Sequence, residues 1–149
     1  MAIAPTERVL GKRLVLAVNR MCVELTGGLG ASRSNLRPGQ ALGFVEGIFY
    51  NEIFGQQLYE DLHAQAAGYL FHIVKTHPFI DGNKRTGLCC ALTLLEWNGL
   101  VVEPLEEETI FDHVMGIAAG PNDAGKVIPE IAQWLRALTT EHRQPGAVA

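Results

Sequence analysis

The hydrophobic positions of the chain recur mostly at intervals of three and four residues, the spacing that places side chains on one face of a helix. Leu14, Val18 and Leu25, for example, fall on one face of a helix expected over residues 6–25. The same reasoning predicts further helices over residues 39–46, 59–76, 84–98, 106–118 and 128–140. Glycines follow the first and fourth of these segments and a proline follows the third, which marks where those helices end. The fold class expected is therefore all-α.

The segment over residues 84–98 differs from the others because it is apolar on nearly every side. Its hydrophobic members are Leu88, Ala91, Leu92, Leu94, Leu95 and Trp97. A helix without a polar face belongs in the interior of a bundle. We therefore predict a helical bundle around a buried central helix formed by this segment.

Three other stretches are not expected to be helical. In residues 47–57, short apolar runs flank Asn51 and Glu52, which is a weak hairpin signal because the turn contains no glycine. Periodicity alone leaves this stretch as an apolar loop. Residues 100–104 are expected to be extended, and residues 141–149 to form a flexible tail.

Composition limits the kinds of protein to consider. A chain of 149 residues suits one domain, and 48% hydrophobic with 19% charged residues is typical of a globular protein that buries a core. The formal net charge of −4 argues against general binding to nucleic acid or to acidic membranes. No run reaches transmembrane length and the first residues lack a signal-peptide layout, so we expect a cytoplasmic protein.

One stretch, HPFIDGNKRTG at residues 77–87, concentrates chemically useful side chains. Pro78 fixes its own φ and disfavours the α region for the residue before it, so the preceding helix should end there. That places His77 at a helix end, where it is available as a general base. Phe79, the large aromatic residue of the loop, is expected to point inward and anchor it.

The second half of this stretch has the features of an anion site. Gly82 allows a close backbone approach or a positive φ, and Asn83 suits the N-cap of the helix that follows. Free N–H groups in the first turn of a helix attract phosphate, and Lys84 and Arg85 add full positive charges there. Asp81 could supply the carboxylate that magnesium uses together with substrate phosphates. These residues together predict a phosphate site with a base beside it.

The motif resembles the signature of the Fic/Doc (Fido) superfamily, and its Asn-Lys-Arg-Thr portion is similar to that of the death-on-curing (Doc) toxin branch. The resemblance extends from the glycine-rich turn at residues 26–30 to near Leu138. It implies a single Fic/Doc domain over residues 1–149. It also implies a small β-hairpin flap over residues 47–57 that holds a target segment by strand addition.

The resemblance further implies an activity. His77 would deprotonate a hydroxyl of a target protein, Asp81 would hold Mg2+, and the phosphates of ATP would be contacted by Gly82, Asn83, Lys84, Arg85 and Thr86. Doc proteins place the γ-phosphate of ATP on elongation factor Tu and so arrest translation. They are the toxins of toxin–antitoxin pairs and are held by a Phd-like antitoxin.

Two positions bear on which phosphorus atom is attacked. The AMP-transferring Fic branch has a small glycine after the asparagine of the motif and a second arginine three positions after the first. This chain has Lys84 and Leu88 at those positions. A bulky cation and a missing clamp on the terminal phosphates favour phosphoryl transfer, with nucleotidyl transfer (AMPylation) as the alternative.

Two other classes of function remain open. A metal-dependent hydrolase could use His77 and Asp81, although it would need further ligands that the sequence does not show. A non-catalytic binding module could carry the motif as a relic. A requirement for a nucleotide would separate the transferase from the hydrolase. If His77→Ala left a cellular effect unchanged, that result would indicate the binding module.

Several other features have structural explanations. Cys22, Cys89 and Cys90 lie in apolar helical stretches and form no metal or disulfide pattern, so we expect them to pack as small hydrophobic residues. His63, His72 and His113 are expected to serve packing or the surface. Three acids at residues 106–108 suit the first turn of a helix.

Residues 120–127 match the spacing of a phosphate-binding P-loop, but Val127 replaces the required Ser or Thr and the segment follows a helix, so we interpret it as a connection. Arg33 and Lys75 lie outside the motif and could contact phosphate or a target, without a pattern that assigns either role.

Overall fold

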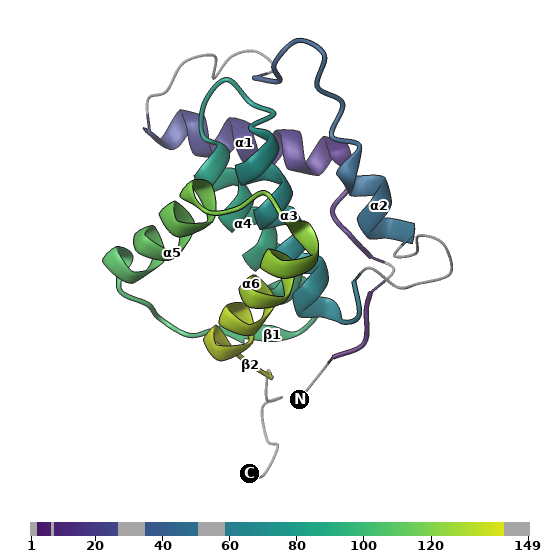
Figure 1. The fold of residues 1–149 in the computed structure, drawn as a ribbon, viewed down its shortest axis with the longest axis vertical. Helices are drawn as coiled ribbons and strands as arrows, with labels where there is room; N and C mark the ends of the chain where they lie inside the picture. The colour runs from purple at the N-terminus through teal and green to yellow at the C-terminus, as the bar shows by residue number, and fades with distance from the viewer. Residues whose placement is uncertain (1–2, 7, 27–34, 51–58, 142–149) are drawn as a thin grey trace.

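The structure, a computed structural model, describes residues 3–6, 8–26, 35–50 and 59–141. Within these ranges the chain forms six helices and one small sheet, as the expected fold class requires (Figure 1). The elements are α1 (Lys12–Thr26), α2 (Phe44–Tyr50), α3 (Leu62–Thr76), α4 (Asn83–Trp97), β1 (Leu100–Val102), α5 (Glu107–Ala119), α6 (Ala124–Leu138) and β2 (Thr139–Glu141).

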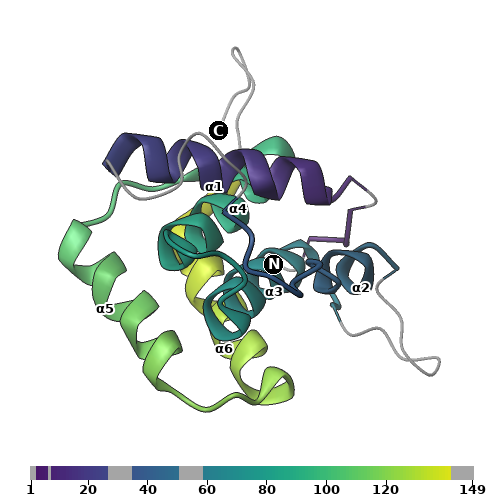
Figure 2. The same cartoon turned by 90° about the horizontal axis from the view of Figure 1, so that it is seen from above.

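Helix α3 lies at the centre of the bundle. It contacts α2, α4, α5 and α6, and most of its residues are buried on all sides, among them Tyr69, Leu70 and Ile73 at 0% exposure. Figure 2 shows α1 crossing above the α3 and α4 pair, with α5 on the far side from α2. The central helix is thus α3 and not the segment predicted from its apolar residues.

Helix α4 is less enclosed than its sequence predicts. Its inner face packs against α3 and α1, but Trp97 is 59% exposed and Leu88 is only half-buried. An apolar residue at the surface is common, because polar residues are too few to cover a protein. Counting apolar positions therefore overestimates how deeply this helix is buried.

The first helix begins later than predicted, at Lys12 instead of residue 6. The preceding residues bond to α3 instead: Ile3 accepts from the backbone N–H of Leu62 (2.8 Å), and the side chain of Gln65 binds both the N–H and the carbonyl of Thr6 (2.8 and 3.0 Å). Backbone groups held in this way by another element do not need helical partners. The N-terminal part of the prediction was wrong for this tertiary reason.

The segment after α1 also differs from the prediction. Residues 39–43 are not helical, and α2 occupies Phe44–Tyr50. The part of the expected hairpin flap at residues 47–50 is therefore helix, and residues 51–57 lie outside the described ranges. The two strands found among the described residues, β1 and β2, are elsewhere: they pair antiparallel with Leu100 opposite Glu141.

That sheet changes the last predicted helix. Helix α6 begins at Ala124, four residues before the prediction, and ends at Leu138 because Thr139 and Thr140 pair with Val102 and Val101. The P-loop-like stretch is a connection only over residues 120–123, which join α5 to α6, whereas residues 124–127 form the first turn of α6 and were wrongly predicted as loop. No helix in the described part of the chain is both long and apolar enough to cross a membrane.

A prediction follows from the close contact between α3 and the segment before it. A Cβ at Gly68 would lie 2.6 Å from Cε1 of the buried Tyr59 ring, whereas a Cβ at Gly116 in α5 meets nothing within 4 Å. Alanine at either site gains roughly 1 kcal/mol of helix propensity. Overpacking costs about 1–3 kcal/mol, so we expect Gly68→Ala to be destabilised relative to Gly116→Ala by about that amount. Urea unfolding of both variants measures the difference, and equal stabilisation by both would contradict it.

Candidate active site

The motif loop begins at the end of α3 with His77 in an uncommon backbone conformation. His77 has φ 51 and ψ 53, the left-handed region, and its N–H donates to the carbonyl of Ile73 at 3.2 Å. A non-glycine residue in this region is uncommon and costs free energy. The sequence prediction that the helix ends here and presents His77 is confirmed.

A neighbouring segment, residues 35–37, pairs with the loop and holds this conformation. Leu36 and Phe79 form an antiparallel bridge, Arg37 N–H donates to the Pro78 carbonyl at 2.8 Å, and Ile80 N–H donates to the Asn35 carbonyl at 2.7 Å. The guanidinium of Arg37 also donates to the carbonyl of His77 at 2.8 Å. Sequence reasoning missed Arg37, and no local pattern identifies it, because its partner lies forty residues away.

The loop is fastened to α4 by two hydrogen bonds between one side chain and one residue. Asn83 Oδ1 accepts from the N–H of Phe79, and Asn83 Nδ2 donates to the carbonyl of Phe79, both at 2.9 Å. Phe79 is fully buried, as predicted for an anchor. Asn83 is therefore not the side-chain cap that we expected: Gly82, at φ 77, is the N-cap, and the positive φ predicted as one possibility for Gly82 is confirmed.

A buried asparagine of α1 holds the loop on the side that faces α1. Asn19 is 1% exposed, and its Nδ2 donates to the carbonyl of Asp81 at 2.9 Å and to Oγ1 of Thr86 at 3.1 Å. Thr86 itself is fully buried, so its side chain lies beneath the loop and not on the surface where we expected a phosphate contact. A polar residue among the buried positions of an amphipathic helix was the signal for Asn19.

The start of α4 has the donors of an anion site. The N–H of Thr86 is the first in this helix to donate to a backbone carbonyl, that of Gly82 at 2.8 Å. The N–H groups of Asn83, Lys84 and Arg85 are therefore the orphan donors of a helix start. The first turn has no acidic residue, and neither cation forms an ion pair with a described carboxylate.

These groups open on a pocket of about 630 Å³. The motif lines one side of it through His77, Ile80, Asp81, Gly82, Asn83, Lys84 and Arg85. The other walls are Cys22 of α1, Leu88 of α4 and, from α5, Glu107, Ile110, Phe111, Val114 and Met115. All the predicted site residues except Phe79 and Thr86 meet here. The contribution of α5 was not predicted, because a packed amphipathic helix gives no sequence signal for which of its residues face a ligand.

Lys75 helps to hold α5 as a wall of this pocket. Its ammonium donates to the carbonyls of Ala118 and Gly120 at the end of α5, the first at 3.1 Å. A cation that binds the last carbonyls of a helix stabilises that helix end. Lys75 thus has a structural role in this structure, and Arg33 lies outside the described residues.

Asp81 is the motif residue that could hold a metal ion. It is exposed, and its Oδ1 accepts the N–H of Gly82 at 2.8 Å. The described residues contain no cluster of three His, Cys, Asp or Glu side chains that could hold a metal by themselves. One carboxylate beside phosphate donors fits magnesium, which keeps water ligands and binds substrate phosphates as well.

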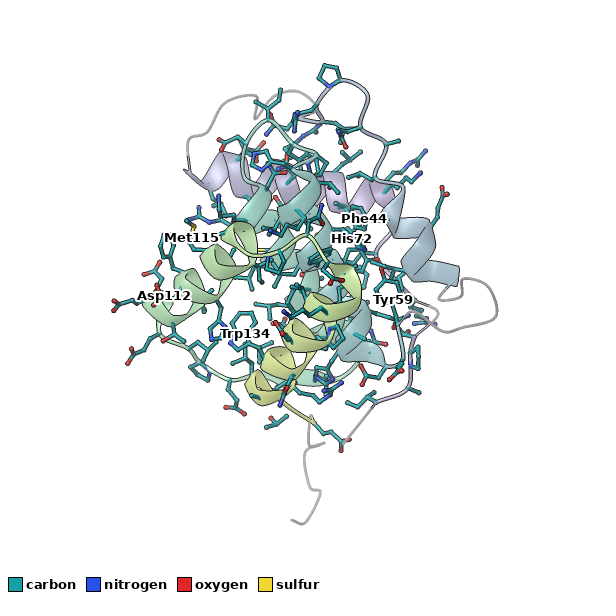
Figure 3. All side chains as sticks on the ribbon, in the orientation of Figure 1. Phe44, Tyr59, His72, Asp112, Met115 and Trp134 are labelled. Atoms are coloured by element: carbon teal, nitrogen blue, oxygen red, sulfur yellow. The ribbon has the colours of Figure 1, made fainter. Side chains whose placement is uncertain are left out.

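The other histidines have packing partners, as predicted. His72 is hydrogen-bonded to the Tyr59 hydroxyl at 3.0 Å and stacks on Phe44, and burial lowers its pKa. Figure 3 shows these three residues on the α2 side of the molecule, away from Met115 of the pocket wall. His63 is bound to Thr139 at 2.8 Å and its pKa is lowered by burial, while His113 stacks on Trp134.

The fold and the pocket together define a helical protein in which the loop between α3 and α4 brings a histidine, a carboxylate, two cations and the free N–H groups of a helix start to one pocket. The chain belongs to the Fic/DOC family, whose sequence profile matches residues 10–95. Members of this family are generally transferases that act on proteins and typically use nucleotide substrates. The match includes the motif and ends before α5, so the α5 wall of the pocket lies outside it.

One curated relative is a protein named Toxin Doc from Mycolicibacterium smegmatis. It is 28% identical to this chain over 89 residues, which cover 59% of this chain and 68% of the relative. The chain is thus similar, over part of its length, to a family member that is named as a toxin.

The buried position of Asn19 leads to a prediction about stability. Asn19→Ala removes both of its hydrogen bonds and leaves Thr86 and the Asp81 carbonyl without this donor, which should cost about 1–3 kcal/mol. Asn98→Ala is a matched control, because the Asn98 amide donates to the Leu94 carbonyl of its own helix end. Urea unfolding compares the two. A loss for Asn19→Ala no larger than that for Asn98→Ala would show that the loop does not depend on α1.

Proposed function

We propose that the chain is a Doc-like protein kinase that transfers the γ-phosphate of ATP to a hydroxyl of another protein. The observation that carries this proposal is the convergence of His77, Asp81, Lys84 and Arg85 with the orphan N–H groups of α4 on one pocket. Phosphoryl transfer depends mainly on positioning and on charge stabilisation, and this pocket supplies both.

Each residue has a role in the proposed reaction. The imidazole of His77 takes the proton of the attacking hydroxyl, because it is the histidine that lines the pocket among the described residues. The N–H groups of residues 83–85, together with Lys84 and Arg85, bind the phosphate oxygens and stabilise the charge that develops on them. Asp81 would hold Mg2+, which neutralises phosphate charge and orients the nucleotide when bound.

Asn83 and Thr86 are proposed to hold the site in place, and their side chains are not proposed to contact phosphate. The Asn83 side chain binds Phe79 and the Thr86 hydroxyl accepts from Asn19, so both are engaged within the protein. In the proposed complex Asn83 contacts phosphate through its backbone N–H, and Thr86 contributes by fixing the first turn of α4. Gly82 supplies the left-handed backbone conformation, φ 77, from which that turn begins.

The pocket favours phosphoryl transfer over AMP transfer. Leu88 lines the pocket at the position where AMP-transferring relatives have their second arginine, so an apolar side chain stands where a clamp on the terminal phosphates would be. Lys84 lines it where those relatives have glycine. Without the clamp and with a larger cation, the nucleotide is expected to present its γ-phosphate to His77.

The biological setting is proposed from the likeness to Toxin Doc. In this setting the chain is the toxin of a toxin–antitoxin pair, its target is a translation factor such as elongation factor Tu, and a Phd-like antitoxin inhibits it. The cytoplasm is the compartment where these partners meet. A non-catalytic binding module is the alternative, and an absence of transferase activity would favour it.

The test is transfer of radioactive label from ATP to purified elongation factor Tu. We expect label from γ-labelled ATP and none from α-labelled ATP. His77→Ala should lower the rate by roughly a hundredfold to ten-thousandfold, because it removes the general base. His113→Ala is the matched control, since His113 stacks on Trp134 and does not line the pocket.

The other outcomes each identify a different function. Label from the α position means nucleotidyl transfer, and free phosphate without labelled protein means hydrolysis. If no label appears, the assay is repeated with a whole-cell lysate as the source of targets. A lysate that also stays unlabelled would exclude transferase activity under these conditions and leave the binding module.

A second prediction concerns Arg37 as a positioning residue. Arg37→Ala removes the hydrogen bond to the His77 carbonyl, so the base should be misplaced and kcat should fall by about 10-fold to 100-fold. KM for ATP should stay unchanged, because Asn83 and Asn19 still hold the start of α4. Arg37→Lys keeps a donor and should restore part of kcat. An equal effect on KM, or no effect on kcat, would rule out this positioning role.

A further inference from the structure

Two cysteines that are far apart in the sequence meet at the wall of the pocket. Cys22 of α1 and Cys89 of α4 have their sulfur atoms 3.9 Å apart, within hydrogen-bonding distance for thiols. Cys22 is 4% exposed and lines the pocket, and Cys89 is half-buried. The structure thus places a pair of thiols beside the proposed phosphate site.

The surroundings make the two thiols chemically unequal. The hydrogen bond with Cys89 lowers the pKa of Cys22, and a hydrogen bond with Thr86 and the positive charge of Arg85 act in the same direction, against the effect of burial. The same hydrogen bond, together with burial, raises the pKa of Cys89. Since the thiolate is the reactive form, Cys22 is the thiol that reacts first.

We propose that Cys22 and Cys89 form a peroxide-sensitive pair that closes to a reversible disulfide between α1 and α4. The sulfur atoms are 3.9 Å apart, and a disulfide needs about 2.05 Å, so they must approach by just under 2 Å. Side-chain rotation and a small shift of two packed helices can supply such a distance. The pocket gives a small oxidant access to Cys22.

The chemistry requires a peroxide and no other reagent. The Cys22 thiolate attacks one oxygen of hydrogen peroxide, the O–O bond breaks, and hydroxide leaves, which gives a sulfenic acid at Cys22. Cys89 then attacks that sulfur, the S–O bond breaks, and the oxygen leaves as water with the proton of the Cys89 thiol. Two thiols are oxidised and one peroxide is reduced to two waters.

The second step is helped by the first. The hydrogen bond and the charge of Cys22 are among the causes that raise the pKa of Cys89. A neutral sulfenic acid at Cys22 removes that charge, so Cys89 becomes easier to ionise once Cys22 has been oxidised. A resolving thiol next to the oxidised one is the arrangement by which redox-sensing cysteines form disulfides.

Cys90 offers a matched control within the same helix. It is adjacent to Cys89 but 0% exposed, and burial raises its pKa to about 12. It does not line the pocket. The proposal therefore selects Cys89 over its neighbour.

The disulfide would reinforce a junction that the proposed site uses. At this place α1 and the start of α4 are joined by the hydrogen bond from Asn19 to Thr86, and Cys89 follows Arg85 by one helical turn. A covalent link would restrict any movement of α4 relative to α1. The proposal does not rest on the proposed function, because its test measures the mass of the chain and not its activity.

The test uses the whole reduced protein treated with hydrogen peroxide, followed by alkylation and mass spectrometry. We expect a loss of about 2 Da, two hydrogen atoms, and two fewer alkylated thiols. Trypsin should then release residues 21–33 linked to residues 86–126, because it cleaves after Arg20, Arg33, Arg85 and Lys126. Dithiothreitol should reverse the link.

Variants decide which thiols are used. Cys90→Ala should keep the link, and Cys22→Ala and Cys89→Ala should each lose it. The proposal is overturned by no change in mass, by a link that persists in Cys89→Ala, by a bond between Cys89 and Cys90, or by a link between two chains. Oxidation of Cys22 to an acid that never forms the link would overturn it as well.

Discussion

The two hydrogen bonds between Asn83 and the backbone of Phe79 are the constraint on which the site depends. They join the loop to the first residue of α4, while the buried Phe79 ring fixes the loop to the core. His77, the proposed base, lies before these bonds along the chain, and the proposed phosphate donors of residues 83–85 lie at and after them. The two hydrogen bonds therefore fix His77 and the N–H groups of residues 83–85 relative to one another, which is what the proposed catalysis by positioning would require.

This unit needs support from segments that are distant in the sequence. Residues 35–37 hold the outer edge of the loop, and Asn19 holds its inner side through the Asp81 carbonyl. The left-handed conformation of His77 costs free energy and persists because these contacts determine the path of the chain around it. The motif loop is thus stabilised by the tertiary fold more than by its own residues.

The same distinction explains what the sequence predicted and what it did not. Features decided within a few residues were predicted: the end of α3 before Pro78, the positive φ of Gly82, and the inward Phe79. Features that depend on contacts between distant parts of the chain were not predicted. The late start of α1, the burial of Thr86 and the central position of α3 each depend on partners that come from other helices.

The pocket combines two kinds of surface with different consequences. The motif supplies charge and hydrogen-bond donors, whereas α5 supplies a mainly apolar wall, with Phe111 and Met115 at 61% and 38% exposure and Glu107 as its charged member. An apolar wall lowers the local dielectric constant and so strengthens the attraction between Lys84, Arg85 and a bound phosphate. It also offers a surface on which a flat aromatic group can pack. Since α5 lies beyond the residues that match the family, the proposed chemistry rests on the shared motif, and we expect the residues outside the match to contribute to the choice of ligand.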